Sequence, residues 1–399
     1  MTTLATKWGL DESRFWLHGN TPDEIVWLDE ASGLWNVHGH PETLAILEDP
    51  ATYSSNTARL YAAEADVDFG DAFDGNPVQM DPPFHSKLRR LVNRAFTPKT
   101  VADLEPRIAA LAHELLDAVA GDDRIELVSA LAYQLPVIVI AELLGVPASE
   151  RDMFKGWVEK IYDGDGEVSL NPTEEQRREI EEGLALAAKL RDYLRGHAEE
   201  RRHTPREDLL TQLVEAEVDG QRLTTTEVAT FANVLLLAGH ITTTMLLGNT
   251  LLCLDAEPGV DARLRADRSL LPAVIEESLR YLTPISTLYR ATMGDVEIAG
   301  QRIPKDRLIA VRIGAANRDE RVFERPDMFD PDRSPNPHLG FGRGIHFCIG
   351  APLARLEGRI ALDILLERFP VLRVDEDNPP TFLPTADMTG VKTLTLLTR

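Results

Sequence analysis

The residue best placed to do chemistry in this 399-residue chain is a cysteine among glycines, directly before a predicted helix. Cys348 is one of only two cysteines, and it lies in the run F-G-R-G-I-H-F-C-I-G, residues 341–350. A thiol before a helix N-terminus faces unpaired backbone N–H groups and the positive end of the helix dipole, which favour the thiolate. Gly342, Gly344 and Gly350 let the backbone turn tightly against a flat group. Such a thiolate suits an axial ligand of haem iron, and the alternative is a buried structural cysteine.

The whole run resembles, without a mismatch, the haem-binding loop F-G-x-G-x-H-x-C-x-G of the cytochrome P-450 monooxygenases. The resemblance implies that Cys348 ligates the iron of haem b, with Phe341, Gly342 and Gly350 around it. It implies a mainly α fold with small β-sheets, in which haem is buried between a long distal helix and the helix that follows the cysteine loop. It also implies a soluble bacterial-type enzyme that inserts one oxygen atom of O2 into a small organic substrate, by hydroxylation or epoxidation.

Four further side chains match positions that this family uses to bind the haem propionates. His85 and Arg89 are four residues apart in D-P-P-F-H-S-K-L-R-R, so they share one helix face. Arg290 in L-Y-R-A and His346, two residues before the cysteine, match further propionate contacts. Arginine binds carboxylates bidentately and keeps its charge, so the residue types suit the ligand. Taken singly, each of the four also fits a solvated cation.

A pair of opposite charges matches the structural network behind the haem in this family. Glu277 and Arg280 in E-E-S-L-R are three residues apart and share a helix face. The resemblance implies that they join Arg333, from F-D-P-D-R, in a buried network with a scaffold role. Removing one member of such a network strands a charge. On its own, the pair fits an exposed surface ion pair.

The segment L-A-G-H-I-T-T, residues 237–243, resembles the distal-helix motif A-G-x-(Asp/Glu)-T of the family. Ala238, Gly239 and Thr242 stand at the matching positions and are the candidate catalytic residues. In the family the glycine leaves room for dioxygen, and the acid and threonine organise water that delivers protons. Ile241 occupies the position of the acid, and isoleucine can neither donate a proton nor hold water.

The missing acid leaves three explanations open. Thr242, with Thr243 or His240 and ordered water, could suffice, or the substrate could bring a polar group. Alternatively, the reaction needs fewer protons or uses peroxide, as in an atypical coupling enzyme. Ile241 could also simply pack against an apolar substrate. A haem-thiolate binding or sensing protein without turnover is the alternative outside catalysis.

The family's substrate-contacting regions map onto parts of 61–80 and 155–175, the distal helix, the strand after E-x-x-R and a C-terminal turn. The resemblance implies a mainly aliphatic pocket and an apolar secondary metabolite, such as a polyketide or macrolide made in antibiotic biosynthesis. An acidic stretch within 64–74 could select a basic group on the substrate or could simply be solvated. The substrate-lining candidates are Leu237, Ile241, Ile285, Thr287 and Met388.

Soluble family members receive electrons from ferredoxin and ferredoxin reductase. The docking face would surround the cysteine, where a local basic patch could steer an acidic iron–sulfur protein. Six cations fall on the elements expected there: Lys87, Arg90, Arg94, Arg343, Arg355 and Arg359.

Composition restricts the partners and the cellular location that the sequence allows. A net charge of -23 argues against nucleic acid and anionic membrane as partners. Two cysteines give no disulfide framework, and the N-terminus lacks a signal-like pattern, so the sequence predicts a cytoplasmic protein. The uncharged segment 228–254 is long enough to span a membrane. It contains Asn233, His240 and Asn249 and has no Lys/Arg-rich flank, so we expect a helix buried in a soluble protein.

The pattern of apolar residues predicts one domain over 1–399, helical near 84–282 and 351–368 and β-rich near 20–40, 285–315 and 380–399. Gly33 and Gly300 predict two β-hairpins, and a long irregular stretch is expected over 54–83. Thr224 and Glu227 form a capping-box pattern. The individual helices are predicted over 84–96, 101–120, 124–143, 148–163, 173–203, 206–218, 224–255, 270–282 and 351–368.

Overall fold

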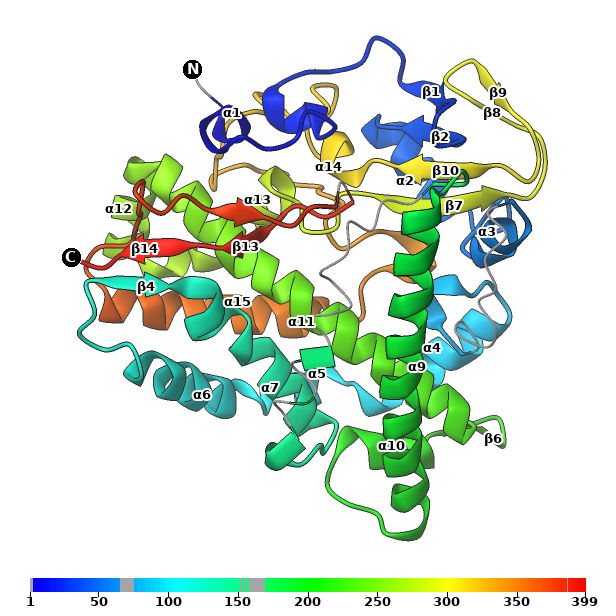
Figure 1. Cartoon of the computed structure of the whole chain (residues 1–399), viewed down its shortest axis with the longest axis horizontal. Helices are drawn as coiled ribbons and strands as arrows, with labels where there is room; N and C mark the ends of the chain where they lie inside the picture. Colours follow the sequence, from blue (N-terminus) through cyan, green and yellow to red (C-terminus); the bar gives the residue numbers. More distant parts are fainter. Residues whose placement is uncertain (1–2, 65–74, 151–152, 154–155, 158–168, 386) are drawn as a thin grey trace.

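The computed structural model describes residues 3–64, 75–150, 153, 156–157, 169–385 and 387–399. The uncharged segment forms one continuous helix, α11 (Thr225–Ala256), which crosses the interior (Figure 1). The predicted capping box is present, because Thr224 accepts a hydrogen bond from the backbone N–H of Glu227 and the Glu227 carboxylate accepts one from the backbone N–H of Thr224. Among the described helices, α11 alone is long and apolar enough to span a membrane, but 72% of its apolar window is buried, as in a core helix.

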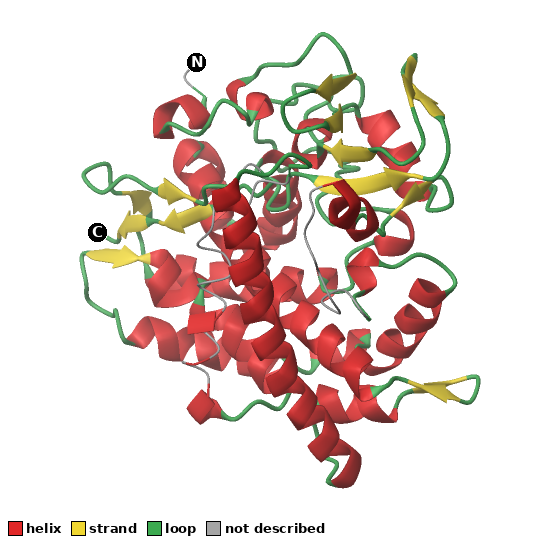
Figure 2. Cartoon of the chain, turned by 45° about the vertical axis from the view of Figure 1, so that its right-hand side comes forward, coloured by secondary structure: helices red, strands yellow, loops and turns green. Residues whose placement is uncertain are grey.

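Helices make up most of the described chain, as the sequence predicted, and they surround α11 (Figure 2). Before α11 they are α1 (Leu4–Trp8), η1 (Phe15–His18), α2 (His40–Glu48), α3 (Ala58–Glu64), η2 (Pro77–Gln79), α4 (Phe84–Ala95), α5 (Pro98–Ala102), α6 (Glu105–Asp117), the π-helical η3 (Val128–Ala132), α7 (Gln134–Leu143), η4 (Ala148–Glu150), α9 (Glu174–His203) and α10 (Leu209–Glu215). After it come α12 (Pro258–Ala266), η5 (Arg268–Leu270), α13 (Leu271–Tyr281), α14 (Ile313–Ala316), η6 (Gly344–His346) and α15 (Ala351–Arg368).

Small sheets lie at the margins of the helical body (Figure 2). The largest has the order β1-β2-β10-β7-β3 and is antiparallel except where β10 pairs with β2. Its strands are β1 (Val26–Asp29), β2 (Leu34–Val37), β3 (Tyr53–Ser54), β7 (Leu288–Thr292) and β10 (Leu308–Val311). The others are β4 (Arg124–Glu126), β5 (Glu217–Val218), β6 (Gln221–Arg222), β8 (Val296–Ile298), β9 (Gln301–Ile303), β11 (Arg373–Val374), β12 (Thr381–Phe382), β13 (Val391–Thr393) and β14 (Thr395–Leu397).

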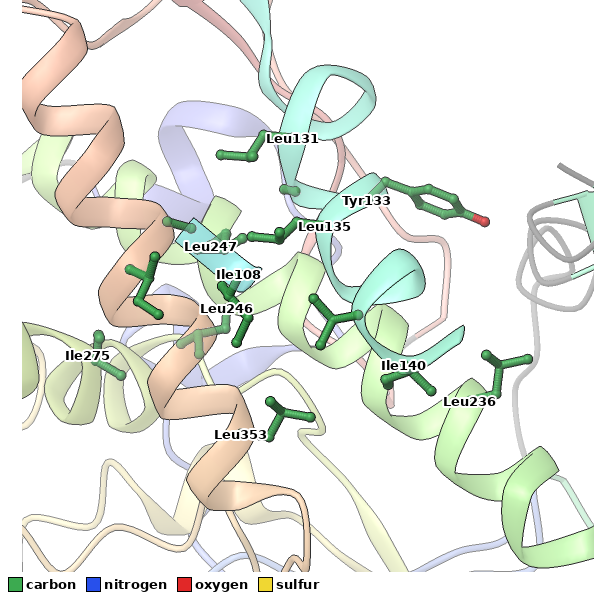
Figure 3. Packing of buried hydrophobic residues seen from close by; sticks show 14 of the residues in the cluster. Ile108, Leu131, Tyr133, Leu135, Ile140, Leu236, Leu246, Leu247, Ile275 and Leu353 are labelled. Carbon is green, nitrogen blue, oxygen red and sulfur yellow. The ribbon is translucent and has the colours of Figure 1, made fainter. Parts of the chain in front are cut away.

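The main core forms where α11 packs against α7, α9, α13 and α15. Figure 3 shows its aliphatic side chains meeting between these helices, with Ile140 of α7 beside Leu236 of α11. Leu246 and Leu247 continue this contact toward α15 and α13, where Leu353 and Ile275 lie. This packing fixes the position of α11 relative to α15, the helix that follows the cysteine loop.

Several predicted boundaries were wrong, and each has a physical reason. The helix expected from 124 begins instead as β4, because Ile125 pairs with Leu396 near the other end of the chain. The helix expected over 101–120 is divided between α5 and α6, and Pro106 lies in the first turn of α6. The stretch 54–83 contains α3, and α12 follows α11 because Pro258 begins a new helix. The helix predicted over 148–163 lies largely outside the described residues.

Candidate active site

The cysteine loop joins η6 to α15 and depends on two glycines. Gly342 and Gly344 have φ values of +68° and +67°, a region that residues with a Cβ rarely adopt. A Cβ at Gly344 would also lie 2.5 Å from the carbonyl oxygen of Leu47. The backbone N–H of Cys348 donates to the carbonyl of Phe341 at 2.9 Å, which closes the loop. The backbone therefore turns as the glycine pattern predicted.

The sequence predicted that the helix N-terminus would lower the pKa of Cys348 and favour its thiolate, and the structure adds an opposing effect. Hydrogen bonds from the backbone N–H groups of Gly350 and Ala351 and the charges of Arg89 and Arg355 lower the pKa of the thiol, but burial outweighs them and raises it. The helix N-terminus alone does not produce a thiolate. Gly350 has an ordinary helical φ of -79°, and a Cβ there would lie 3.8 Å from the sulfur. The backbone conformation at position 350 therefore does not require a glycine.

The four candidate propionate ligands come from three elements and meet beside the cysteine loop. α4 supplies His85 and Arg89, β7 supplies Arg290, and η6 supplies His346. The rings of His85 and His346 are 4.2 Å apart between centroids. Arg89 donates from Nη2 to the carbonyl of Phe347 at 2.6 Å, directly before Cys348. Chain segments more than 250 residues apart thus bring these polar groups together.

These groups repel one another electrostatically. Burial, and then the charge of Arg290, lowers the pKa of His346 to about 3, and burial, and then Arg89, lowers the pKa of His85. Burial lowers the pKa of Arg290 to about 10. In the described part of the chain, no carboxylate lies within 4 Å of Arg89 or Arg290, and the buried Nδ1 of His85 has no hydrogen-bond partner. The two propionates of haem would supply the missing negative charge and an acceptor, so the cluster fits this cofactor.

Two residues that the sequence analysis missed support His346. Ser55 lies 2.9 Å from His346, between Oγ and Nε2, and its backbone N–H donates to Asp81 at 2.9 Å. Asp81 also accepts a hydrogen bond from the Ser54 hydroxyl. Asp81 stands four residues before His85, in the same D-P-P-F-H segment, which was the only local sign of its role.

The structural network predicted for Glu277, Arg280 and Arg333 is present and buried. Arg280 donates to both carboxylate oxygens of Glu277, at 2.9 and 2.7 Å, and Arg333 lies 3.3 Å from one of them. Arg280 also binds the carbonyls of Asn317, Pro326 and Met328. This charged cluster ties α13 to the segment that leads into the cysteine loop.

One face of α11 differs from the rest of this buried helix. Ala238 is exposed and Thr242 is partly exposed, one helical turn apart, while most of the helix around them is buried. Thr242 donates from Oγ1 to the carbonyl of Ala238 at 2.6 Å, so its lone pairs remain able to accept a hydrogen bond. Leu237 is also partly exposed. This face is the candidate distal surface.

Gly239 and His240 lie on the side of α11 that packs against α7 and η3. A Cβ at Gly239 would lie 2.3 Å from Cδ1 of Ile140, so the glycine permits close packing of α11 on α7. His240 is fully buried and lies 3.0 Å from the carbonyl of Tyr133, between Nε2 and O. It therefore faces η3 and α7, away from the side of Ala238. Thr243 donates back to the carbonyl of Gly239 at 3.0 Å.

Ile241 belongs to a small apolar cluster with the C-terminal turn. It is buried with Met245 and Leu383, and Ile285 and Met388 pack against them. Ile285 and Met388 also form an isolated β-bridge. The structure thus brings together three of the five proposed substrate-lining residues, Ile241, Ile285 and Met388, while Leu237 of the same helix packs against the main core. The fifth, Thr287, is buried and accepts a hydrogen bond from Arg312 at 3.0 Å.

Most of the proposed docking cations are paired, so the patch is less positive than the sequence implied. Arg355 binds Glu276, Arg359 binds Glu105, and Arg343 binds Glu48, at 2.6, 2.8 and 3.0 Å. Arg90 lies 3.3 Å from Asp219, and Arg94 donates to the carbonyl of Glu217 at 2.6 Å. The acidic residues 66, 68, 71 and 74, and most of the predicted substrate region 155–175, lie outside the described residues.

Comparisons with known proteins agree with this arrangement. The family model for cytochrome P-450 matches residues 35–397. Cyclomarin C epoxidase of Salinispora arenicola is 40% identical over 399 residues, with 99% of each chain covered. Erythromycin C-12 hydroxylase of Saccharopolyspora erythraea is 40% identical over 390 residues, with 95% of this chain and 93% of the relative covered. The crystal structure of HmtT, involved in himastatin biosynthesis, is 54% identical with a TM-score of 0.91 and full coverage of both chains.

The match extends over nearly the whole chain and includes the cysteine loop, the charged network behind it and the distal helix. Members of this family hold haem iron through a cysteine thiolate. The chain therefore belongs to the cytochrome P-450 family and is a monooxygenase.

Proposed function

We propose that this protein binds haem b and hydroxylates or epoxidises a small, largely apolar secondary metabolite in antibiotic biosynthesis. The observation that carries the proposal is the convergence of His85, Arg89, Arg290 and His346, without a paired carboxylate among the described residues, beside Cys348. The relatives named for cyclomarin, erythromycin and himastatin support the class of substrate.

The residues present fit haem b in charge and in the chemistry of their donor groups. Cys348 would ligate the iron, and the positive charge of the metal would stabilise the thiolate that burial opposes. His85, Arg89, Arg290 and His346 would bind the propionates. The Glu277–Arg280–Arg333 cluster would hold the cysteine loop in place from behind.

Bound haem supplies the activation of dioxygen and the transfer of one oxygen atom to carbon. The protein's own part is to place the substrate and to control protons. Thr242 is the candidate for proton handling, because its hydroxyl is anchored to the Ala238 carbonyl and can still accept a hydrogen bond from water. His240 faces the other side of α11, so Thr242 with water, or with a polar group of the substrate, remains the proposed route. Ile241 and Met388 would contact the apolar part of the substrate.

Bacterial members of the family generally receive electrons from ferredoxin and ferredoxin reductase. We extend this to the present protein, with docking at the face around Cys348, α4 and α15. We further propose that residues 1–399 act as one domain in the cytoplasm. The buried character of α11 supports a location away from the membrane.

The proposal is tested by the absorbance of the reduced protein with carbon monoxide, which reports thiolate ligation of haem. The native protein and Cys253→Ala are expected to show the thiolate-specific band, because Cys253 is a fully buried cysteine of the core. Cys348→Ala is expected to lack that band. A band that persists in Cys348→Ala, or is absent from the native protein, would refute the proposal. NADPH consumption without an oxygenated product would instead favour a sensing protein or uncoupled chemistry.

A further inference from the structure

The described residues of the C-terminal turn, 383–385 and 387–389, lie directly against the distal helix. A Cβ at Gly390 would be 2.1 Å from Cγ of Met245, and a Cβ at Gly248 would be 2.4 Å from Cγ2 of Val391. Both glycines therefore allow the C-terminal segment to approach α11 so closely that no further side-chain atom fits between them. Met245 is one helical turn from Thr242, so a displacement of the turn acts on the helix at the candidate distal surface.

One arginine from the opposite end of the sequence holds this turn. Nη2 of Arg14 lies 3.0 Å from the carbonyl oxygen of Leu383, 2.6 Å from that of Thr385 and 3.2 Å from that of Met388. Arg14 is 3% exposed, so water does not replace these hydrogen bonds. Three converging carbonyl dipoles repel one another, and the buried cationic nitrogen placed among them offsets the repulsion.

The position of Arg14 is itself fixed by its neighbour. Trp16 is 4% exposed and lies so close to α14 that a Cβ at Gly314 would be 2.8 Å from its indole ring. The backbone N–H of Gly314 donates to the carbonyl of Ser286 at 3.0 Å, which links this anchor to the segment before β7. Arg14 therefore reaches the turn from a rigid support.

The other side of the turn has separate supports. The carbonyl of Asp387 accepts hydrogen bonds from the backbone N–H groups of Ser286 and Thr287, and its carboxylate accepts one from the Tyr289 hydroxyl at 2.6 Å. Thr389 donates to the carbonyl of Pro284 at 2.8 Å. These contacts hold the edge next to β7, while Arg14 holds Leu383, Thr385 and Met388.

We propose that Arg14 is a positioning residue for the substrate, which acts by holding the C-terminal turn against α11 so that Met388 and Leu383 form one wall of the substrate pocket. The inference rests on the proposed function, because it requires the side of α11 that carries Ile241 to face the substrate. Its expected signature is selective: large ligands that reach the turn are affected, and small ligands that reach only the haem are not.

The test uses two azoles that coordinate haem iron, imidazole as the small probe and clotrimazole as the bulky one, with binding followed by the Soret shift. In Arg14→Met, the Kd for clotrimazole is expected to rise about tenfold, and the Kd for imidazole is expected to change by less than about twofold. Arg14→Lys, which keeps a cation with three donors, should restore the clotrimazole Kd to within about threefold of the native value. An unchanged clotrimazole Kd in Arg14→Met, or equal weakening of both azoles, would overturn the proposal.

Arg265→Met is the matched control. Arg265 likewise binds two backbone carbonyls, those of Leu366 and Phe369, but at the end of α15. It should alter neither Kd, and a selective loss of clotrimazole binding in this variant would contradict the assignment to Arg14. Failure of the native protein to shift with imidazole would count against the proposed function instead.

A measurement on the native holoenzyme covers the case in which Arg14→Met does not take up haem. Clotrimazole is expected to increase protection from hydrogen exchange in both 11–18 and 381–391, because Arg14 joins these segments, whereas imidazole should protect neither. Protection confined to 381–391 would show that the N-terminal segment does not respond with the turn and would overturn the proposal.

Discussion

Thr242 is the residue whose hydroxyl has the geometry for proton handling. In Thr242→Ala the hydroxyl that would accept a hydrogen bond from the proton-carrying water is lost, while haem binding should persist because Cys348 and the propionate cluster are untouched. The rate of product formation is expected to fall about 100-fold, the lower end of what positioned proton transfer contributes. Product formed per NADPH consumed, together with haem content, measures this. Thr242→Ser keeps the hydroxyl and should retain most of the activity, and equal loss in both variants would contradict the proposed role.

Ile241 stands where an acid is expected, within an apolar cluster of α11 and the C-terminal turn. A carboxyl group there would be desolvated and so kept protonated, which makes it a potential proton donor. Ile241→Glu is expected to increase product formed per NADPH consumed by roughly twofold or more, with some loss of stability from the buried polar group. Ile241→Gln has a similar size but cannot supply a proton, so it should not raise this ratio. A ratio that is unchanged or lower in Ile241→Glu would show that no relay is missing.

At the scale of elements, α15 carries a buried acid in the core. Burial raises the pKa of Glu357 from 4.5 to about 8. Because the folded state binds this proton more tightly than the unfolded state, the contribution of Glu357 to stability is fully present below pH 4.5 and falls by about 1.4 kcal/mol per pH unit until pH reaches about 8.

Glu357→Gln removes this titration. The variant is expected to be more stable than the native protein above pH 8 and equally stable near pH 4, as measured by Tm of the holoprotein across this range. Glu367→Gln is the control, because Glu367 is an exposed acid on the same helix. If Tm depends on pH in the same way in Glu357→Gln and in the native protein, the carboxyl group of Glu357 does not occupy the buried position described.

At the scale of the whole molecule, a protein of net charge -23 must still attract an acidic electron donor if ferredoxin is its partner. Lys87 and Arg94 of α4 are the best placed to do so, because Arg90 of α4 and the arginines of α15 and the cysteine loop are paired with acids. Lys87→Ala combined with Arg94→Ala is expected to lower the rate of electron transfer from ferredoxin several-fold at low salt and to flatten its salt dependence. Stopped-flow reduction in the presence of carbon monoxide measures both effects.

Arg359→Ala is the control for this pair, since Arg359 is already paired with Glu105 at 2.8 Å. It should change the rate and its salt dependence much less than the α4 pair. If the double variant behaves like the native protein, the docking face is not the one around α4.

The sequence by itself determined the family, the helical class of fold and the residues gathered around Cys348. These features depend on motifs of about ten residues and on helix caps, such as Thr224 with Glu227, in which the interacting groups are near neighbours along the chain. Helices α9, α11 and α15 were predicted to within about two residues for the same reason. The charged network of Glu277 could be named because its members lie in recognisable short motifs.

Tertiary structure alone decided which way side chains face and which distant segments meet. Gly239 packs on Ile140 and His240 faces Tyr133, two orientations that the motif itself does not specify. The pairing of β4 with β14 joins two segments far apart in the sequence, and the clamp of Arg14 on the C-terminal turn joins the two ends of the chain. Such contacts leave no periodic trace in the sequence, because they arise only when the whole core has packed and has set the rotation of each helix.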